Sequence, residues 1–145
     1  AMIKGKRAVP KTYAKKILQG LMNMQLDEGG FAVPLETQAD SFSTALALES
    51  FVYISHFGGK DEMHKCANAL IALQKTEGGW EGNFILRIPA PYVLDPKMVS
   101  AYDNPDGGGN SLIKDEGGLF ATVMSCYALN VYHRFIIKNA IHPTN

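Results

Sequence analysis

Hydrophobic residues recur along this chain at the spacing of an α-helix in four separate stretches. These stretches are residues 11–25, 42–57, 60–75 and 120–137. The first and third have an apolar and a polar face, whereas the second and fourth are apolar on nearly every side. The pattern predicts an all-α chain in which the first and third helices are outer and the second and fourth are inner. Any sheet is expected to be no more than a small hairpin within residues 81–95.

Two of the predicted helices end in closely similar turns. Gln25–Phe31 reads QLDEGGF, and Gln74–Trp80 reads QKTEGGW about 49 residues later. A third copy, Asp115–Leu119, keeps the acidic residue and both glycines but lacks the glutamine and the aromatic ring. The segments after the first and third turns also agree, since Phe42–Leu46 aligns with Phe120–Met124. Self-similarity of this kind predicts a repeated unit of helix, glutamine, glycine turn and second helix.

Each residue type in the turn has a predicted structural role. The paired glycines can adopt positive φ and let the backbone turn sharply where the helix ends. Phe31 and Trp80 are large enough to cover the turn. The amides of Gln25 and Gln74 can bond backbone groups that the helix end leaves bare. The faces that precede the turns are expected to carry Tyr13, Ile17, Leu21 and Met24 in the first helix and Cys66, Ala69, Leu70 and Leu73 in the third.

An apolar helix followed by Q-x-x-x-G-G-[WF], and then by a helix that opens with [ST]-T-A-L at Ser43–Leu46, resembles the repeat of terpene cyclases and protein prenyltransferases. That family includes the squalene and hopene cyclases. The resemblance extends from about Lys11 to Tyr132 and implies a toroid of inner and outer α-helices. Four predicted helices, against about twelve in a complete toroid of the family, imply a partial α/α toroid. The resemblance also implies an isoprenoid or another hydrophobic small molecule as substrate.

Two aspartates are the candidate catalytic acids. Class II cyclases of the family protonate the substrate with an aspartate of a D-x-D-D motif, which this chain lacks. Asp40 stands where an inner helix begins, which in the family faces the cavity, but an aspartate there can equally serve as a helix N-cap. Asp115 belongs to the third glycine turn, where a structural role competes with a catalytic one.

A zinc site is not expected. Prenyltransferases of the family hold zinc with an Asp, a Cys and a His, and Tyr127 follows Cys126 as in those enzymes, but Met124 occupies the aspartate position. Two helical turns would separate Cys126 from His133 by about 10 Å, too far to share a zinc ion with ligand distances of about 2.0–2.3 Å. We therefore expect no metal and no other cofactor. Cys126 and Tyr127 stay candidates for contact with the substrate.

Residues 76–119 lack a helical period and are interpreted as a long loop inserted in a single domain, 1–145. A loop of this length is either functional or disordered, and its apolar and aromatic content favours a functional role such as a lid. Arg87, in an apolar and proline-bounded segment, could meet a diphosphate or a carboxylate. An exposed arginine or a salt bridge is the competing interpretation. Tyr92 and Tyr102 complete the candidate substrate-binding residues.

Composition narrows the classes of function. The formal net charge is zero and no basic stripe exists, so nucleic acid is not an expected partner. Cys66 and Cys126 lie in apolar helical runs and are predicted to be reduced core cysteines of a cytoplasmic protein. No apolar run reaches the length of a membrane span, while peripheral membrane contact stays open.

Two classes of function remain. The chain is either an enzyme, or part of one, that acts on an isoprenoid or similar substrate, or a non-catalytic module that binds a hydrophobic ligand or a partner protein. In a monomer of four helices, an apolar side of each inner helix would be uncovered. This predicts a homo-oligomer or a partner subunit, unless residues 76–119 fold over the open side.

Overall fold

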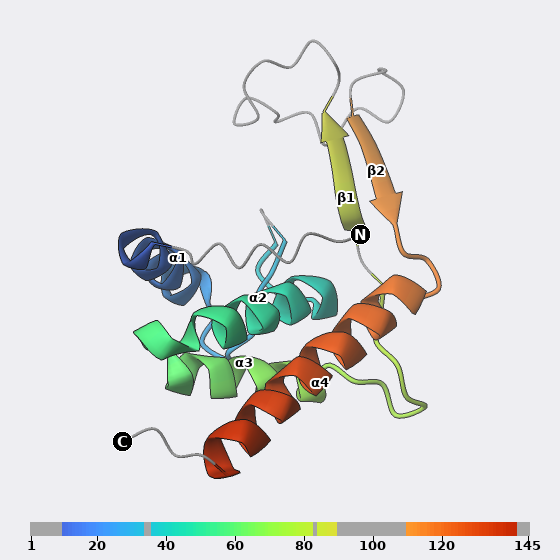
Figure 1. Ribbon diagram of the computed structural model, residues 1–145. Helices are drawn as coiled ribbons and strands as arrows, with labels where there is room; N and C mark the ends of the chain where they lie inside the picture. The colour runs from blue at the N-terminus through green and yellow to red at the C-terminus, as the bar shows by residue number, and fades with distance from the viewer. Residues whose placement is uncertain (1–9, 34–35, 83, 90–109, 142–145) are drawn as a thin grey trace, which may run out of the picture.

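A computed structural model describes residues 10–33, 36–82, 84–89 and 110–141 (Figure 1). Its elements are, in chain order, α1 (Lys11–Met24), α2 (Ser41–Ile54), the short 3₁₀ helix η1 (Ser55–Phe57), α3 (Lys60–Ala72), β1 (Phe84–Pro89), β2 (Asn110–Lys114) and α4 (Leu119–Ile141). The described chain is predominantly helical, and all four predicted helices are confirmed with ends that shift by a few residues. None of the described helices is long and apolar enough to span a membrane.

The ends of α2 and α3 follow from capping and glycine chemistry. Asp40 is the N-cap of α2, and its Oδ1 accepts a hydrogen bond from Ser43 N at 2.7 Å. Gly58 and Gly59 separate α2 and η1 from α3, with φ angles of 128° and 73° that other residues disfavour. A Cβ atom at Gly59 would also collide with the side chain of Leu18 in α1. The predicted break between the second and third helices is thereby confirmed.

The core is built around α2, which contacts α1, α3 and α4 (Figure 1). Its buried side chains include Leu48 and Phe51 from α2, Met63, Cys66, Ala69 and Leu70 from α3, and Ala121 and Ala128 from α4. Burying one leucine or phenylalanine side chain contributes about 1.5–3 kcal/mol, so these contacts hold the helices together. The apolar face predicted for α3 is confirmed by this set.

The apolar face predicted for α1 is wrong for three of its four residues, because only Leu21 packs against the core. Tyr13, Ile17 and Met24 are 64%, 47% and 64% exposed, and α1 buries Ala14 and Leu18 instead. The buried side is shifted by one position along the helix. A small residue such as Ala14 lets two helices approach closely, whereas a row of bulky residues would hold them apart. As a result, α1 keeps an uncovered apolar side.

The inner helices also keep an apolar side that the described chain leaves exposed. In α2, Leu46 and Tyr53 are exposed although most of the helix is buried. In α4, only Ala121, Ser125 and Ala128 are buried along the described helix. The prediction of helices buried almost all round is therefore wrong for α4 and partly right for α2. The expectation that four helices leave the inner ones incompletely covered is confirmed.

The prediction of two core cysteines is correct for one of them. Cys66 is buried and its Sγ donates to Thr44 O at 3.4 Å, and burial raises the pKa of its thiol to about 12. Cys126 is exposed. It has apolar neighbours in the sequence, but it lies on a side of α4 that the other helices do not cover. Apolar composition alone could not reveal which side of α4 that is.

Strands β1 and β2 form an antiparallel pair in which Arg87 pairs with Leu112. Figure 1 shows the pair standing off from the helices near the first turn of α4. The hairpin expected within residues 81–95 is wrong in extent, because the second strand lies at residues 110–114. A short hairpin can be predicted from the turn residues that stand between its two strands. Strands this far apart in the sequence carry no such signal, so their pairing could not be predicted.

Candidate functional site

The two glycine turns share a backbone hydrogen bond and the conformation of their first glycine, whereas the second glycine has a positive φ, 74°, only at Gly79. In the first turn Leu26 N donates to Gly30 O at 3.0 Å, and in the second Lys75 N donates to Gly79 O at 3.0 Å. The first glycine of each pair has a φ angle near the left-handed region, 92° in one turn and 88° in the other. The shared sequence pattern therefore corresponds to a shared local structure.

The aromatic residue of each turn is buried and tied to the helix that follows. Phe31 N donates to Thr44 Oγ1 at 3.0 Å, and Trp80 N donates to Thr122 Oγ1 at 3.0 Å. Trp80 also donates from its indole Nε1 to Leu70 O at 2.7 Å. The predicted structural role of both rings is confirmed, because both are buried, Phe31 against Phe51 of α2 and Trp80 bonded to α3.

The two glutamines behave differently. Gln25 Nε2 donates to Gly29 O at 2.8 Å and to Glu62 O of α3 at 2.9 Å, so that it joins its own turn to the next outer helix. Gln74 is exposed, and its side chain makes no hydrogen bond within the described residues. The predicted locking role is therefore confirmed for Gln25 and wrong for Gln74. The reason is that Gln25 bonds the outer helix that follows α2, whereas no outer helix follows α4 among the described residues.

Asp40 has a structural role and a free oxygen. Its side chain is only 8% exposed, and Oδ1 caps α2 as described above. Its Oδ2 is buried and has no hydrogen-bond partner among the described residues. A buried carboxylate oxygen without a partner is costly, so a donor from a ligand or from water would stabilise it.

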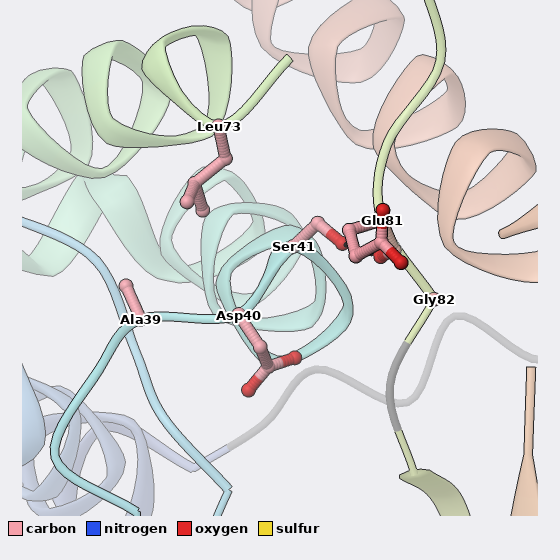
Figure 2. Close-up of a pocket in the computed structure, with 6 residues that line it drawn as sticks. All are labelled: Ala39, Asp40, Ser41, Leu73, Glu81 and Gly82. Carbon is pink, nitrogen blue, oxygen red and sulfur yellow. Dashed lines mark hydrogen bonds between the residues drawn. The ribbon is translucent and has the colours of Figure 1, made fainter. Parts of the chain in front are cut away.

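A pocket of about 200 Å³ lies beside this carboxylate. It is lined by Ala39, Asp40, Ser41, Leu73, Glu81 and Gly82 (Figure 2). Ser41 Oγ donates to Glu81 O at 2.9 Å, and Figure 2 shows the Asp40 carboxylate extending away from Leu73. Ligand pockets generally exceed about 300 Å³, so this one suits a small polar group and not an isoprenoid chain.

Asp115 caps the other inner helix. Its Oδ2 accepts a hydrogen bond from Ala121 N in the first turn of α4 at 2.7 Å. Its carbonyl oxygen lies so close to Gly82 that a Cβ atom there would collide with it. The starts of α2 and α4 therefore both lie beside residues 81–82, and the two predicted acids are brought to the same end of the molecule. Both use one carboxylate oxygen to cap a helix.

A second candidate site is the exposed aromatic surface where α2 and α4 lie side by side. We define the inner face as Phe42, Leu46, Tyr53, Phe120 and Tyr127. The rings of Phe42 and Phe120 are 5.5 Å apart between centroids. A side-chain hydrogen bond to Tyr127, with burial and the Glu49 carboxylate as smaller causes, raises the pKa of Tyr53. These pairs link the two helices at both ends of the inner face and make it one surface.

The remaining predicted residues are not brought together with the inner face. Of the candidate substrate contacts, only Tyr127 belongs to it, and Cys126 is exposed on a neighbouring side of α4. Arg87 lies in β1, while Tyr92 and Tyr102 fall outside the described residues. Sequence reasoning missed Phe42 and Tyr53, although aromatic residues eleven positions apart lie on one side of the helix and were an available signal.

The described residues contain no group of three or more His, Cys, Asp or Glu side chains that could hold a metal ion. Compared with known proteins, the chain matches no protein-family model and no curated protein. Function is therefore inferred from the residues and their geometry. The inner face can bind an apolar surface, and the Asp40 pocket can accept a single hydrogen bond.

Proposed function

We propose that this chain binds an isoprenoid or a similarly apolar small molecule on the inner face, as one part of a terpene cyclase-like or prenyltransferase-like α/α toroid. The observation that carries this proposal is the exposure of the inner face. Leu46, Tyr53, Phe120 and Tyr127 are between 41% and 62% exposed, although all four are large and mostly apolar. Contiguous apolar patches of this kind mark binding surfaces on folded domains.

The glycine turns support the toroid-like arrangement. They give the α1–α2 and α3–α4 pairs the same hydrogen bonds between an outer helix, a turn and an inner helix. In a toroid made of such units, the second helix of each unit would line the cavity. The inner face is carried by those two second helices, α2 and α4.

The chemistry of the inner face suggests the kind of ligand. Aromatic rings and Leu46 suit an apolar chain, which would gain about 25 cal/mol for each Å² of apolar surface removed from water. The hydroxyl oxygen of Tyr53 lies on this exposed surface and can accept a hydrogen bond. A ligand with a long apolar chain and one oxygen-bearing end group fits both features.

Acid catalysis by Asp40 is the second candidate function, and the unpartnered Oδ2 is the observation that favours it. However, Asp40 lies outside the inner face, beside a pocket too small for an isoprenoid. Its other oxygen caps α2, and Asp115 likewise caps α4. Binding therefore ranks before catalysis for the described residues.

The proposal can be tested by adding farnesol to the protein with a fluorescent apolar dye bound. The fall in dye fluorescence measures how much dye farnesol displaces. Leu46→Asp places a charge in the middle of the inner face, and we expect it to weaken farnesol binding by at least about tenfold, equivalent to about 1.4 kcal/mol. Tyr53→Phe should weaken binding of farnesol more than binding of the corresponding hydrocarbon, because it removes only the hydroxyl.

Met22→Asp is the matched control, since Met22 is an exposed apolar residue of α1 outside the inner face. It should leave farnesol binding unchanged. Equal binding by the wild type and Leu46→Asp, with both folded by circular dichroism, would rule out the inner face as the ligand site.

A further inference from the structure

One side of α4 carries exposed apolar residues that do not belong to the inner face. We define the α4 stripe as Leu119, Val123, Cys126 and Asn130, which lie on one side of the helix, next to the inner face. Leu119 is 73% exposed and Val123 is 54% exposed, and the other two are also exposed. Apolar residues at the start of the stripe are thus left in contact with water.

The same side of α2 is covered. Thr44 and Thr122 accept the same hydrogen bond from the preceding turn, so α2 and α4 can be compared position by position. At the α2 positions that match the first three residues of the α4 stripe, Ser41, Ala45 and Leu48 are 4%, 0% and 0% exposed. In α2 this side is packed within the fold, whereas in α4 it is open.

In α2 this side is covered by the outer helix α3, so the matching side of α4 should be covered by a helix that resembles α3. α3 packs on α2, and its Cys66 Sγ donates to Thr44 O at 3.4 Å. The counterpart of α3 in the first half of the chain is α1, because both helices lead into the same glycine turn. At the positions of α1 that match buried Cys66 and Ala69, Ile17 is 47% exposed and Gly20 is also exposed. We define the α1 stripe as Ile17, Gly20 and Met24.

The glutamines give the same result independently. Gln25 Nε2 reaches across to Glu62 O in α3. Gln74 occupies the matching place at the end of α3, is exposed, and bonds nothing among the described residues. The residue of α1 that matches Glu62 is Tyr13. The carbonyl of Tyr13 is therefore the atom of α1 that corresponds to the acceptor of Gln25.

We propose that a second copy of this chain docks head to tail on the first, with the α1 stripe of the second copy against the α4 stripe of the first. Gln74 of the first copy then donates to the carbonyl of Tyr13 in the second. The contact continues, from one chain to the next, the packing that already joins α3 to α2 within the chain. The formal net charge of zero means that the copies do not repel each other overall.

Such a contact joins two different surfaces, so each copy can use both of its ends, and the copies form a closed ring or a filament. This property allows a decisive test with two variants of the full chain. Ile17→Glu places a charge in the α1 stripe alone, and Val123→Glu places a charge in the α4 stripe alone. Analytical ultracentrifugation at micromolar concentration should give several times 15.8 kDa for the wild type and the mass of one chain for each variant.

An equimolar mixture of the two variants should form a 1:1 complex of two chains and nothing larger. Val123→Glu still offers an intact α1 stripe, and Ile17→Glu still offers the intact α4 stripe that receives it. The second contact in such a pair would bring two glutamates together, so growth stops. A symmetric dimer through one stripe alone would behave differently, because the variant that leaves that stripe intact would still dimerise without its partner variant.

Met22→Glu, on another side of α1, is the control that should keep the wild-type mass. Tyr127→Ser, in the inner face, should also keep it, so that loss of ligand binding and loss of assembly are separately visible. If Val123→Glu fails to fold by circular dichroism, Leu119→Glu tests the same stripe. Three results would each overturn the proposal. The wild type could sediment as one chain, the two variants could assemble like the wild type, or the mixture could contain only single chains.

Discussion

At the scale of single residues, the contrast between Gln25 and Gln74 shows how strongly context decides the value of a side chain. Both close an apolar helix and both precede the same turn. Gln25 is partly buried and serves two carbonyl oxygens, whereas Gln74 is exposed. A hydrogen bond contributes about 0.5–1.5 kcal/mol, and a buried acceptor left bare costs about 1–3 kcal/mol. The two positions should therefore respond differently to the same substitution.

We predict that Gln25→Leu lowers the free energy of unfolding by about 1–3 kcal/mol, because Gly29 O and Glu62 O lose their donor. Gln74→Leu should change it by less than about 0.5 kcal/mol, as is usual for an exposed position. Urea denaturation at a concentration where the wild type is a single chain measures both. Equal losses at the two positions would show that Gln74 has a partner within its own chain.

At the scale of elements, helix positions were predictable, whereas the buried face was predictable for α3 but not for most of α1 or for α4. Periodicity, glycine pairs and capping residues act over a few neighbouring residues, so they located α1 to α4 and the break at Gly58–Gly59. Which side of a helix is buried depends on what packs against it. That is why Ile17 and Cys126 were assigned to the core, and why the inner face of α2 and α4 was missed. Strand β1 falls inside the range expected for a hairpin, but its pairing with β2 was missed for the same reason, since the two strands lie far apart in the sequence.

Residues 83–114 should be dispensable for the helical body. The first unit joins its two helices without such an insertion, and the backbone at Gly82 already lies against the carbonyl of Asp115. We predict that a short glycine-serine link from Gly82 to Asp115 leaves the melting temperature within about 4 °C of the wild type, equivalent to about 1 kcal/mol. Circular dichroism measures this. Loss of the cooperative transition would mean that β1 and β2 hold the helices together.

At the scale of the whole molecule, the two halves share one core. α2 contacts both α3 and α4, and Cys66 of α3 is fully buried against it. Neither helix pair therefore has a complete core of its own. Unfolding of one pair would expose the core residues of the other. The two cysteines report on this directly, because one is buried in the shared core and the other is exposed.

We predict that a thiol reagent at pH 8 modifies Cys126 at once and Cys66 only at the rate of global unfolding. The pKa of Cys66 is about 12, above its usual 9.0. From pH about 9 to about 12 the unfolded chain therefore loses a proton that the folded chain keeps, and the free energy of unfolding falls as pH rises through this window. Mass spectrometry follows the labelling. Cys66→Ser should remove this part of the pH dependence, and rapid double labelling of the native wild type would contradict the buried position.

The bonds between helices have a consequence for how this chain can change over generations. Gln25 donates to Glu62 O, Trp80 to Leu70 O and Ser41 to Glu81 O, and every one of these acceptors is a main-chain oxygen. All residue types carry the same carbonyl, so the acceptor position places no restriction on its side chain. Two halves that descend from one duplicated unit can then differ at these acceptor positions, whereas the donors, the glycines and the side-chain acceptors Thr44 and Thr122 are retained. Common ancestry would then be visible only in a few identical residues around a turn. The two halves of this chain resemble each other in this way.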